Sequence, residues 1–470
     1  MSIAQAMWLA VAPRMGDRIE RQAMVLFAPM RSSIISKMRR FFLWLRGTGK
    51  YAAVAGLLGV SWVLGAGAFA AEPTAQWPRF RGPDGTGLSN ANIPAKWSDA
   101  DYNWTIKLPG GGNGSPTVWG DRIFLTCADD RTGEHSVVCV NAGDGSIRWT
   151  RSYPAETYAH HQYNSYASST PAVDDKHVFV CWSTPDELTV VALDHDGKDL
   201  WQKGLGPFES QHGGGQSPIA YEGMVLIGDD QEGPASFLFA LSGDTGAEVW
   251  KVARKPSNKF TAATPCVFHP KHGPAELIFM NKPEGFAALD PKDGRTIWSV
   301  LPKDFDARPV ASPYSADGLI FCSCGDGPSG HCFAAVRPSD DGKTAKIAYE
   351  FRKASPYVPT SIVKDGLLFY VTDAGILVCL HADTGKQIWR QRLDGNFFGS
   401  FVCAGDKLFI LSKESEMYVI AAKDEFELLA RNPLKLESAG AKLPPLSTTP
   451  AIANGHMYVR TYTHLVRIGS

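Results

Sequence analysis

One recurring pattern constrains the fold of this chain more than any other feature of its sequence. It consists of a small residue, Leu or Val, Asp, two turn residues and Gly, followed a few residues later by Trp. A strand-and-turn unit that returns every 40 to 55 residues predicts an array of similar modules. The copies read VNAGDGSIRW (140–149), ALDHDGKDLW (192–201), ALSGDTGAEVW (240–250), ALDPKDGRTIW (288–298), AVRPSDDGKTAKIAY (335–349) and CLHADTGKQIW (379–389).

A second marker runs out of phase with the first, a Ser-Pro or Thr-Pro pair that opens a short apolar stretch. Successive copies lie about 46 to 55 residues apart, and one double step indicates a copy without proline at Gly399-Ser400. The marker therefore predicts eight units. Its other copies are Ser115-Pro116, Thr170-Pro171, Ser217-Pro218, Thr264-Pro265, Ser312-Pro313, Pro359-Thr360 (order reversed) and Thr449-Pro450.

Each unit contains four candidate strands, which in the first unit are 116–119, 122–127, 136–141 and 147–152. The last unit, 449–468, offers only three, and an isolated candidate strand at 103–108 can supply the fourth. This completion would close the ring and leave no sheet edge open. The chain is thus predicted to be all-β, an eight-bladed β-propeller of four-stranded antiparallel blades, closed by an N-terminal strand that completes the last blade.

The conspicuous Trp and Asp residues of the repeat are explained by this fold. The Asp residues lie in tight turns in which Gly supplies a positive φ, so we do not regard them as catalytic. Each Trp begins an outer strand and is large enough to fill the gap between neighbouring blades. The residues expected to dock blades in this way are Trp104, Trp149, Trp201, Trp250, Trp298 and Trp389.

The A-x-D-x-x-T-G-x-x-x-W line resembles the repeat of the pyrroloquinoline-quinone (PQQ) propellers over essentially all of 103–470. The motif WPRFRGP (77–83) is similar to one found in exported PQQ-like repeat proteins. The resemblance implies the propeller fold and one of two functions. One is that of quinone- and calcium-dependent dehydrogenases, and the other is that of cofactor-free scaffolds such as the BamB-type outer-membrane assembly proteins.

The sequence departs from the dehydrogenases in its cysteines. It has no adjacent cysteine pair, the nearest approach being Cys322-Ser323-Cys324, and no Cys-x-x-Cys-His haem motif. We therefore expect a non-catalytic binding or scaffold protein with a protein, peptide or glycan partner and no assigned cofactor or metal. The alternative is a PQQ- and calcium-dependent oxidoreductase that acts on alcohols or sugars.

The N-terminal region has the layout of an export signal. A basic stretch begins at Met38, an uncharged run follows at 51–71, and a small-x-small site predicts cleavage after Ala70. Arg39-Arg40 resembles a twin-arginine signal. We expect translation to start at Met38 and the protein to reach the periplasm or cell envelope. An uncleaved membrane anchor is the alternative, and it would be the chain's contact with a membrane.

Three parts are therefore expected: an extension and signal at 1–70, a short pre-propeller segment at 71–102 and the propeller at 103–470. From residue 71 onward the chain carries 38 basic and 46 acidic residues, a net charge of about −8. No basic block lies there, which argues against nucleic-acid binding. We expect the propeller to be a monomer.

All nine cysteines lie after the signal, most of them in apolar strands where Cys acts as a small hydrophobe. One pair differs, because a hairpin folded about Pro328 would place Cys324 opposite Cys332. An exported protein could oxidise these two thiols to a disulfide.

The loops between blades converge on one mouth of the ring, which makes this mouth the default ligand site. His160, His161 and His212 could hold a metal, but solvent-facing loop histidines are the simpler interpretation. The run His212–Gln216 could cradle an anion, although a glycine-rich turn entering a crowded hub explains it better. The candidate ligand residues are His160, His161, Asn164, His212, Gln216, Lys259, Arg308 and Tyr357.

Overall fold

The computed structural model describes residues 76–326, 329–434 and 446–469. The chain divides into two units, residues 1–72 and 73–470. The expected export signal, with its start at Met38 and its cleavage after Ala70, lies outside the described residues. Within the described part, no helix combines the length and the apolar character needed to cross a membrane.

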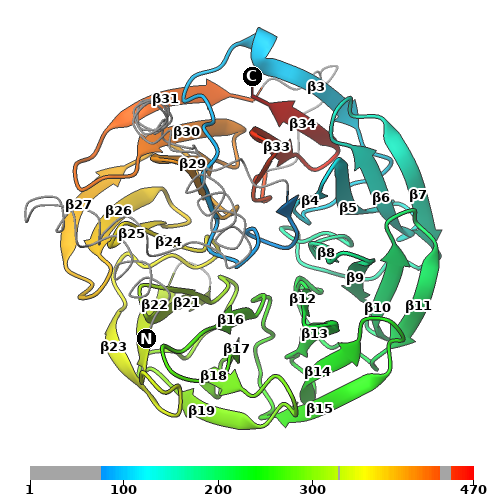
Figure 1. Ribbon diagram of the computed structural model, residues 1–470, viewed down its shortest axis with the longest axis horizontal. Helices are drawn as coiled ribbons and strands as arrows, with labels where there is room; N and C mark the ends of the chain where they lie inside the picture. The colour runs from blue at the N-terminus through cyan, green and yellow to red at the C-terminus, as the bar shows by residue number, and fades with distance from the viewer. Residues whose placement is uncertain (1–75, 327–328, 435–445, 470) are drawn as a thin grey trace, which may run out of the picture. The chain divides into compact units, whose positions relative to one another are not determined.

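Eight sheets follow one another around a ring, each built on a blade of four antiparallel strands, and in seven blades the four strands are adjacent in sequence (Figure 1). The blades are as follows. Blade 1 is β4 (Thr117–Trp119), β5 (Arg122–Ala128), β6 (His135–Asn141) and β7 (Ile147–Tyr153); blade 2 is β8 (Ala172–Val173), β9 (His177–Ser183), β10 (Leu188–Asp194) and β11 (Asp199–Gly204); blade 3 is β12 (Ile219–Tyr221), β13 (Met224–Asp229), β14 (Ser236–Ser242) and β15 (Glu248–Arg254); blade 4 is β16 (Cys266–Phe268), β17 (Glu276–Asn281), β18 (Gly285–Leu289) and β19 (Thr296–Val300). Blade 5 is β20 (Tyr314–Ala316), β21 (Leu319–Asp326), β22 (Ser329–Pro338) and β23 (Ala345–Phe351); blade 6 is β24 (Ile362–Lys364), β25 (Leu367–Val371), β26 (Ile376–His381) and β27 (Gln387–Arg392); blade 7 is β28 (Val402–Ala404), β29 (Lys407–Leu411), β30 (Glu416–Ala421) and β31 (Leu428–Pro433); blade 8 is β32 (Ala451–Ala453), β33 (His456–Arg460), β34 (His464–Ile468) and β3 (Tyr102–Lys107).

The predicted eight-bladed propeller is confirmed, including its closure. β3 pairs antiparallel with β34, with Thr105 opposite Val466, and so completes the last blade. The middle strands of each blade are buried along nearly their whole length because neighbouring blades cover both faces. The hydrophobic cores therefore lie between blades; one contains Phe124 and Val137 of blade 1 with Val178 of blade 2.

The repeated Trp lies at these blade interfaces and contacts the turn of the next blade. In five copies its indole N–H donates to a carbonyl there, at 2.7 to 3.3 Å. The Gly of the same turn has a positive φ, and a side chain on it would collide with the Trp ring. A Cβ atom on Gly197, for example, would lie only 2.6 Å from the ring of Trp149. The five donors are Trp104, Trp149, Trp201, Trp250 and Trp389.

Trp298 makes a different contact from the other repeat tryptophans. Its indole donates to the Glu276 carboxylate of its own blade at 2.8 Å. Burial raises the pKa of Glu276 to about 7, and the Trp298 hydrogen bond acts in the opposite direction. Trp298 is itself buried, so it still packs inside the protein but does not bond the turn of blade 5.

The Ser and Thr residues of the second marker form a hydrogen-bonded belt around the channel. At seven of the eight blade joints, the backbone N–H of one marker residue donates to the hydroxyl of the next, at 2.9 to 3.1 Å. The last of these bonds runs from Thr449 back to Ser115 and joins blade 8 to blade 1. The marker thus sets the spacing of the blades at the hub.

The contribution of the belt to the stability of the protein can be measured with a single substitution. Thr449→Val keeps the shape of the side chain but removes the acceptor of the Ser400 N–H, a bond of 3.1 Å between two buried residues. We expect the free energy of unfolding to fall by about 1–3 kcal/mol, because a buried donor is left unpaired. Thr449→Ser retains the hydroxyl and should lose clearly less in the same urea titration. Equal losses for both variants would show that the hydroxyl does not hold the joint.

The described part of the pre-propeller segment (blue in Figure 1) starts at the centre of the ring and then runs outward to the outer strand of blade 7, where Ala95 and Trp97 bond Asn432. Its strand β1 (Gln76–Trp77) pairs with β4 of blade 1, and β2 (Leu88–Ser89) pairs with β28 of blade 7. A short 3-10 helix, η2 (Asp99–Asp101), then leads into β3. The propeller thus carries this segment as an internal plug.

Two buried arginines attach the pre-propeller segment to distant blades. Arg79 donates to the Pro265 carbonyl of blade 4 at 2.6 Å. Arg81 donates to five carbonyls, including those of Ser361 (2.7 Å) and Phe401 (3.1 Å) in blades 6 and 7. Burial lowers the pKa of each guanidinium to about 10, so both stay charged at neutral pH.

The Cys324–Cys332 hairpin has the predicted register. The two residues pair across β21 and β22, and both are buried. Both thiols are free in this structure, and the hydrogen bond between them lowers the pKa of Cys324. The disulfide therefore stays a prediction, on a pair that the fold already places face to face.

Candidate functional site

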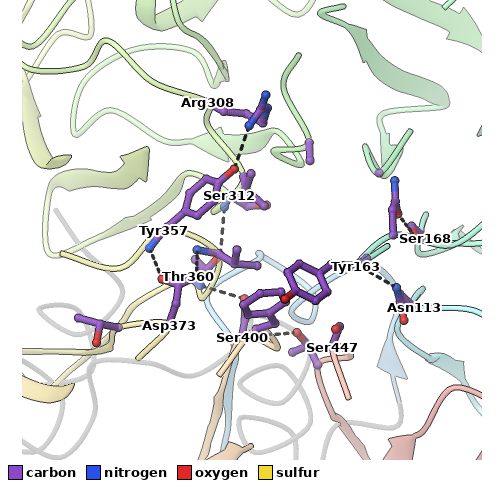
Figure 2. A pocket seen from close by; sticks show the side chains of 18 of the residues that line it. Asn113, Tyr163, Ser168, Arg308, Ser312, Tyr357, Thr360, Asp373, Ser400 and Ser447 are labelled. Atoms are coloured by element: carbon purple, nitrogen blue, oxygen red, sulfur yellow. Dashed lines mark hydrogen bonds between the residues drawn. The ribbon is translucent and has the colours of Figure 1, made fainter. Parts of the chain in front are cut away.

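A cavity of about 1320 Å³ lies at the mouth of the ring on the side of the interblade loops. All eight belt residues line it, so every blade contributes to its wall. The ends of second strands and the turns that follow them also contribute, among them Asp326 at the end of β21 and Asp373 in the turn after β25. Phe80 of the pre-propeller segment lines it as well, which indicates that the plug forms its floor. Figure 2 shows Arg308, Tyr357 and Asp373 on one side and Tyr163 and Asn113 on the other.

Arg308 is the centre of a charged network in the wall. Its guanidinium is 2% exposed and donates to Glu232 (3.3 Å), Asp326 (3.4 Å) and the Tyr357 hydroxyl (3.2 Å). Lys259 forms a second ion pair with Asp326, at 2.6 Å, and this bond lowers the pKa of Asp326. These groups neutralise one another, so the network fixes the wall more than it attracts a ligand.

Planar rings stack beside this network. The His212 ring lies between those of His161 (4.8 Å between centroids) and Phe260 (5.6 Å). Asn164 holds the His212 loop by donating to its carbonyl oxygen at 2.6 Å. The result is a flat, partly apolar surface on the blade 2 and blade 3 side of the cavity.

The environment of His212 predicts how it titrates. Burial, assisted by the Arg308 and His161 charges, lowers its pKa to about 4. Its folded-state pKa lies below the ordinary unfolded value near 6.5, so protonation favours the unfolded chain. This residue's contribution to stability is therefore complete above about pH 6.5 and is lost as the pH falls toward 4. An NMR titration of the His212 ring should give a midpoint near 4; a midpoint near 6.5 would contradict this environment.

Across the mouth, two interblade loops from non-adjacent positions meet. Tyr163, from the loop between blades 1 and 2, contacts Phe398, from the loop between blades 6 and 7, edge to face at 5.2 Å. The Lys413 ammonium lies over both rings, 4.1 Å from the Tyr163 centroid and 3.8 Å from that of Phe398. Burial lowers the pKa of Lys413. We call these three residues the mouth clamp.

The structure places five of the eight candidate residues in the cavity wall: His161, Asn164, His212, Arg308 and Tyr357. The other three lie behind it. His160 packs edge to face on Tyr166, Gln216 is 3% exposed and accepts the Gly215 N–H, and Lys259 is held by Asp326. These partners hold His160 and Lys259, whereas the Nε2 atom of Gln216 is buried without a hydrogen-bond partner among the described residues.

Several wall residues were missed because they lie outside the interblade loops. Asp373 and Lys413 come from turns between second and third strands, which emerge on the same face. Phe80 belongs to the pre-propeller segment, whose path through the ring no repeat pattern encodes. The signal for the two turn residues was present in the sequence, because the strand order alone places these turns at the mouth.

The cavity's donor set can be compared with what calcium and a quinone would require. Calcium takes six to eight oxygen ligands. Asp326 is engaged by Lys259 and Arg308, and Asp373 accepts the N–H groups of Tyr357 (2.8 Å) and Val358 (3.1 Å). Across the described ranges, no group of three or more His, Cys, Asp or Glu is placed to hold a metal ion. Both carboxylates of the wall are therefore already bonded to other groups of the protein.

Comparison with known families gives a match over most of the ring. The family model described as outer membrane protein assembly factor BamB matches residues 103–264 and 284–425. Among curated protein sequences, no match was found.

Solved structures show the same fold at low sequence identity. BamB from Moraxella catarrhalis is 14% identical, with a TM-score of 0.53 over 78% of this chain and 96% of that one. The computationally designed Ika8 protein is 9% identical, with a TM-score of 0.53 over 77% and 98%. Quinohemoprotein alcohol dehydrogenase from Comamonas testosteroni is 13% identical, with a TM-score of 0.49 over 86% and 81%, a likeness too loose to support an argument.

Proposed function

This chain belongs to the family described as outer membrane protein assembly factor BamB, and we propose that it is an exported, non-catalytic propeller that binds a partner in the cavity at its mouth. The observation that carries the proposal is the cavity itself. Its wall draws on all eight blades, and its polar groups and rings converge on one space of about 1320 Å³. Such convergence is typical of binding sites.

The plug supports binding at one mouth over passage through the ring. Residues 76–89 of the pre-propeller segment cross the centre of the ring and are tied to blades 1, 4, 6 and 7 by strand pairing and by Arg79 and Arg81. A partner therefore enters and leaves by the mouth. A chain end, a loop or a glycan end satisfies this geometry, whereas a continuous threaded chain does not.

An oxidoreductase function is the competing hypothesis, and one experiment separates the two. Purified full-length protein is titrated with PQQ and calcium while absorbance and dye reduction are followed with ethanol and glucose as substrates. We expect no turnover, because the carboxylates of the wall are engaged by Lys259, Arg308 and backbone amides. Stoichiometric PQQ binding with turnover would overturn the binding function.

A further inference from the structure

The charges of the cavity wall are unevenly neutralised. Of its two acids, Asp326 is paired with Lys259 and Arg308, whereas Asp373 accepts two backbone N–H groups, which fix its position and leave its negative charge in place. Of the cations that line it, Arg308 and Arg352 are paired with acids. Within the described part of the chain, Lys413 and Arg390 have no carboxylate at ion-pair distance. The charges of Glu414 and Asp373 raise the pKa of Lys413 only from beyond ion-pair distance. Lys413 is therefore a cation of the cavity wall without an ion-pair partner among the described residues, and it can attract the charge of an anionic ligand.

The mouth clamp couples this positive charge to aromatic rings. The Lys413 ammonium lies within about 4 Å of two ring centroids, and Tyr163 is 49% exposed. A ligand that reaches the ammonium must also meet a ring face. The clamp therefore selects a group that joins a carboxylate to a ring with an apolar face. A flexible acidic side chain of a peptide offers the carboxylate without the ring.

A sugar acid has both features. Its carboxylate is attached directly to a pyranose ring, and the C–H groups of that ring form a face that packs on aromatic side chains. Asn113 and Ser447 line the wall near the clamp (Figure 2) and can hydrogen bond to sugar hydroxyls. The volume of about 1320 Å³ exceeds the roughly 300–1,000 Å³ of ordinary small-ligand pockets, so it accommodates several sugar units.

We propose that the cavity binds a sugar acid, with its carboxylate on Lys413 and its ring on Tyr163 and Phe398. This inference rests on the proposed binding function and names its ligand class. The sugar acid can be a free monosaccharide or the end of an acidic glycan. The two sources share the recognised chemistry and differ in how much of the cavity they fill.

Calorimetric titration of the full-length protein tests this proposal. The probes are α-1,4-linked galacturonate trimer, galacturonate monomer, the neutral galactose trimer of the same linkage, and an Asp/Glu hexapeptide. We expect the acidic trimer to bind at least roughly tenfold more tightly than the neutral one, with an affinity that falls as salt is raised. Tighter binding of the trimer than of the monomer would identify a glycan end as the source, and equal binding a free sugar acid.

Two substitutions make the test specific. Lys413→Met should weaken binding of the acidic trimer at least roughly tenfold and leave the neutral trimer unchanged. Lys343→Met, at a lysine that is 79% exposed and does not line the cavity, is the matched control and should change neither. Equal binding of acidic and neutral trimers, or full retention by Lys413→Met, would overturn the proposal. Binding of the hexapeptide alone would overturn the sugar-acid ligand and leave the proposed binding function standing.

Discussion

Arg81→Ala is expected to lower the free energy of unfolding by about 4 kcal/mol or more. Its guanidinium, 1% exposed, donates to five carbonyls at 2.7 to 3.2 Å, in the pre-propeller segment and in two blades. A hydrogen bond to a charged group contributes about 1.5–3 kcal/mol, and the truncation leaves several buried carbonyls unpaired. Gly87, whose φ is +79°, lies against the same side chain, so the turn that contains it would also lose its support.

Urea titration of Arg81→Ala and two further variants shows whether the loss of stability comes from the hydrogen bonds of this guanidinium. Arg81→Lys keeps the charge but lacks the planar fork, so it should recover only part of the loss. Arg295→Ala removes an arginine whose side chain is 65% exposed and should stay within about 0.5 kcal/mol of the parent. A loss below about 1 kcal/mol for Arg81→Ala would mean that the pre-propeller segment is not an integral plug.

Trp104→Ala should have the second largest effect, a loss of about 3 kcal/mol. Trp104 anchors the closing strand β3 by packing on Gly145 and donating to the Ala142 carbonyl of blade 1 at 3.3 Å. Its ring also contacts Tyr458 of blade 8, 6.1 Å between centroids. Removing a large, partly buried ring forfeits this packing and leaves a cavity at the joint where the ring closes.

The matched variant is Trp149→Ala, which removes the equivalent contact between blades 1 and 2. There the indole N–H of Trp149 donates to the backbone carbonyl of His195 at 3.0 Å. Similar losses in thermal and urea unfolding are expected if the closing joint is equivalent to an internal one. Trp104→Phe keeps an aromatic ring and should lose less than Trp104→Ala. An unchanged melting temperature for Trp104→Ala would refute closure by β3.

The fold was predictable because its information repeats. Each Asp-turn-Gly-Trp line encodes one blade, and the missing fourth strand of the last unit pointed to residues 103–108. The meaning of the Ser/Thr marker was not predictable in the same way. A hydroxyl such as that of Thr449 bonds the N–H of another unit, Ser400, and this pairing exists only once the ring has formed.

The candidate site was only partly predictable, for a related reason. Loop position correctly indicated the mouth, but it could not show which polar groups are already engaged. Lys259 is held by Asp326, whereas Lys413 rests on two aromatic rings contributed by loops 235 residues apart in sequence. The run Arg79-Phe80-Arg81 carries no periodic signal, so its place inside the channel could come only from the structure.

The central claim is that the partner binds at the mouth of the ring. A photoreactive phenylalanine derivative at Tyr163, which lines the mouth, tests it against the same residue at Asp365, in the exposed β24–β25 turn on the opposite face. After irradiation of cells that make the full chain, we expect discrete cross-linked species from position 163 and none from position 365. Cross-links from position 365 alone, or equally from both, would contradict binding at the mouth.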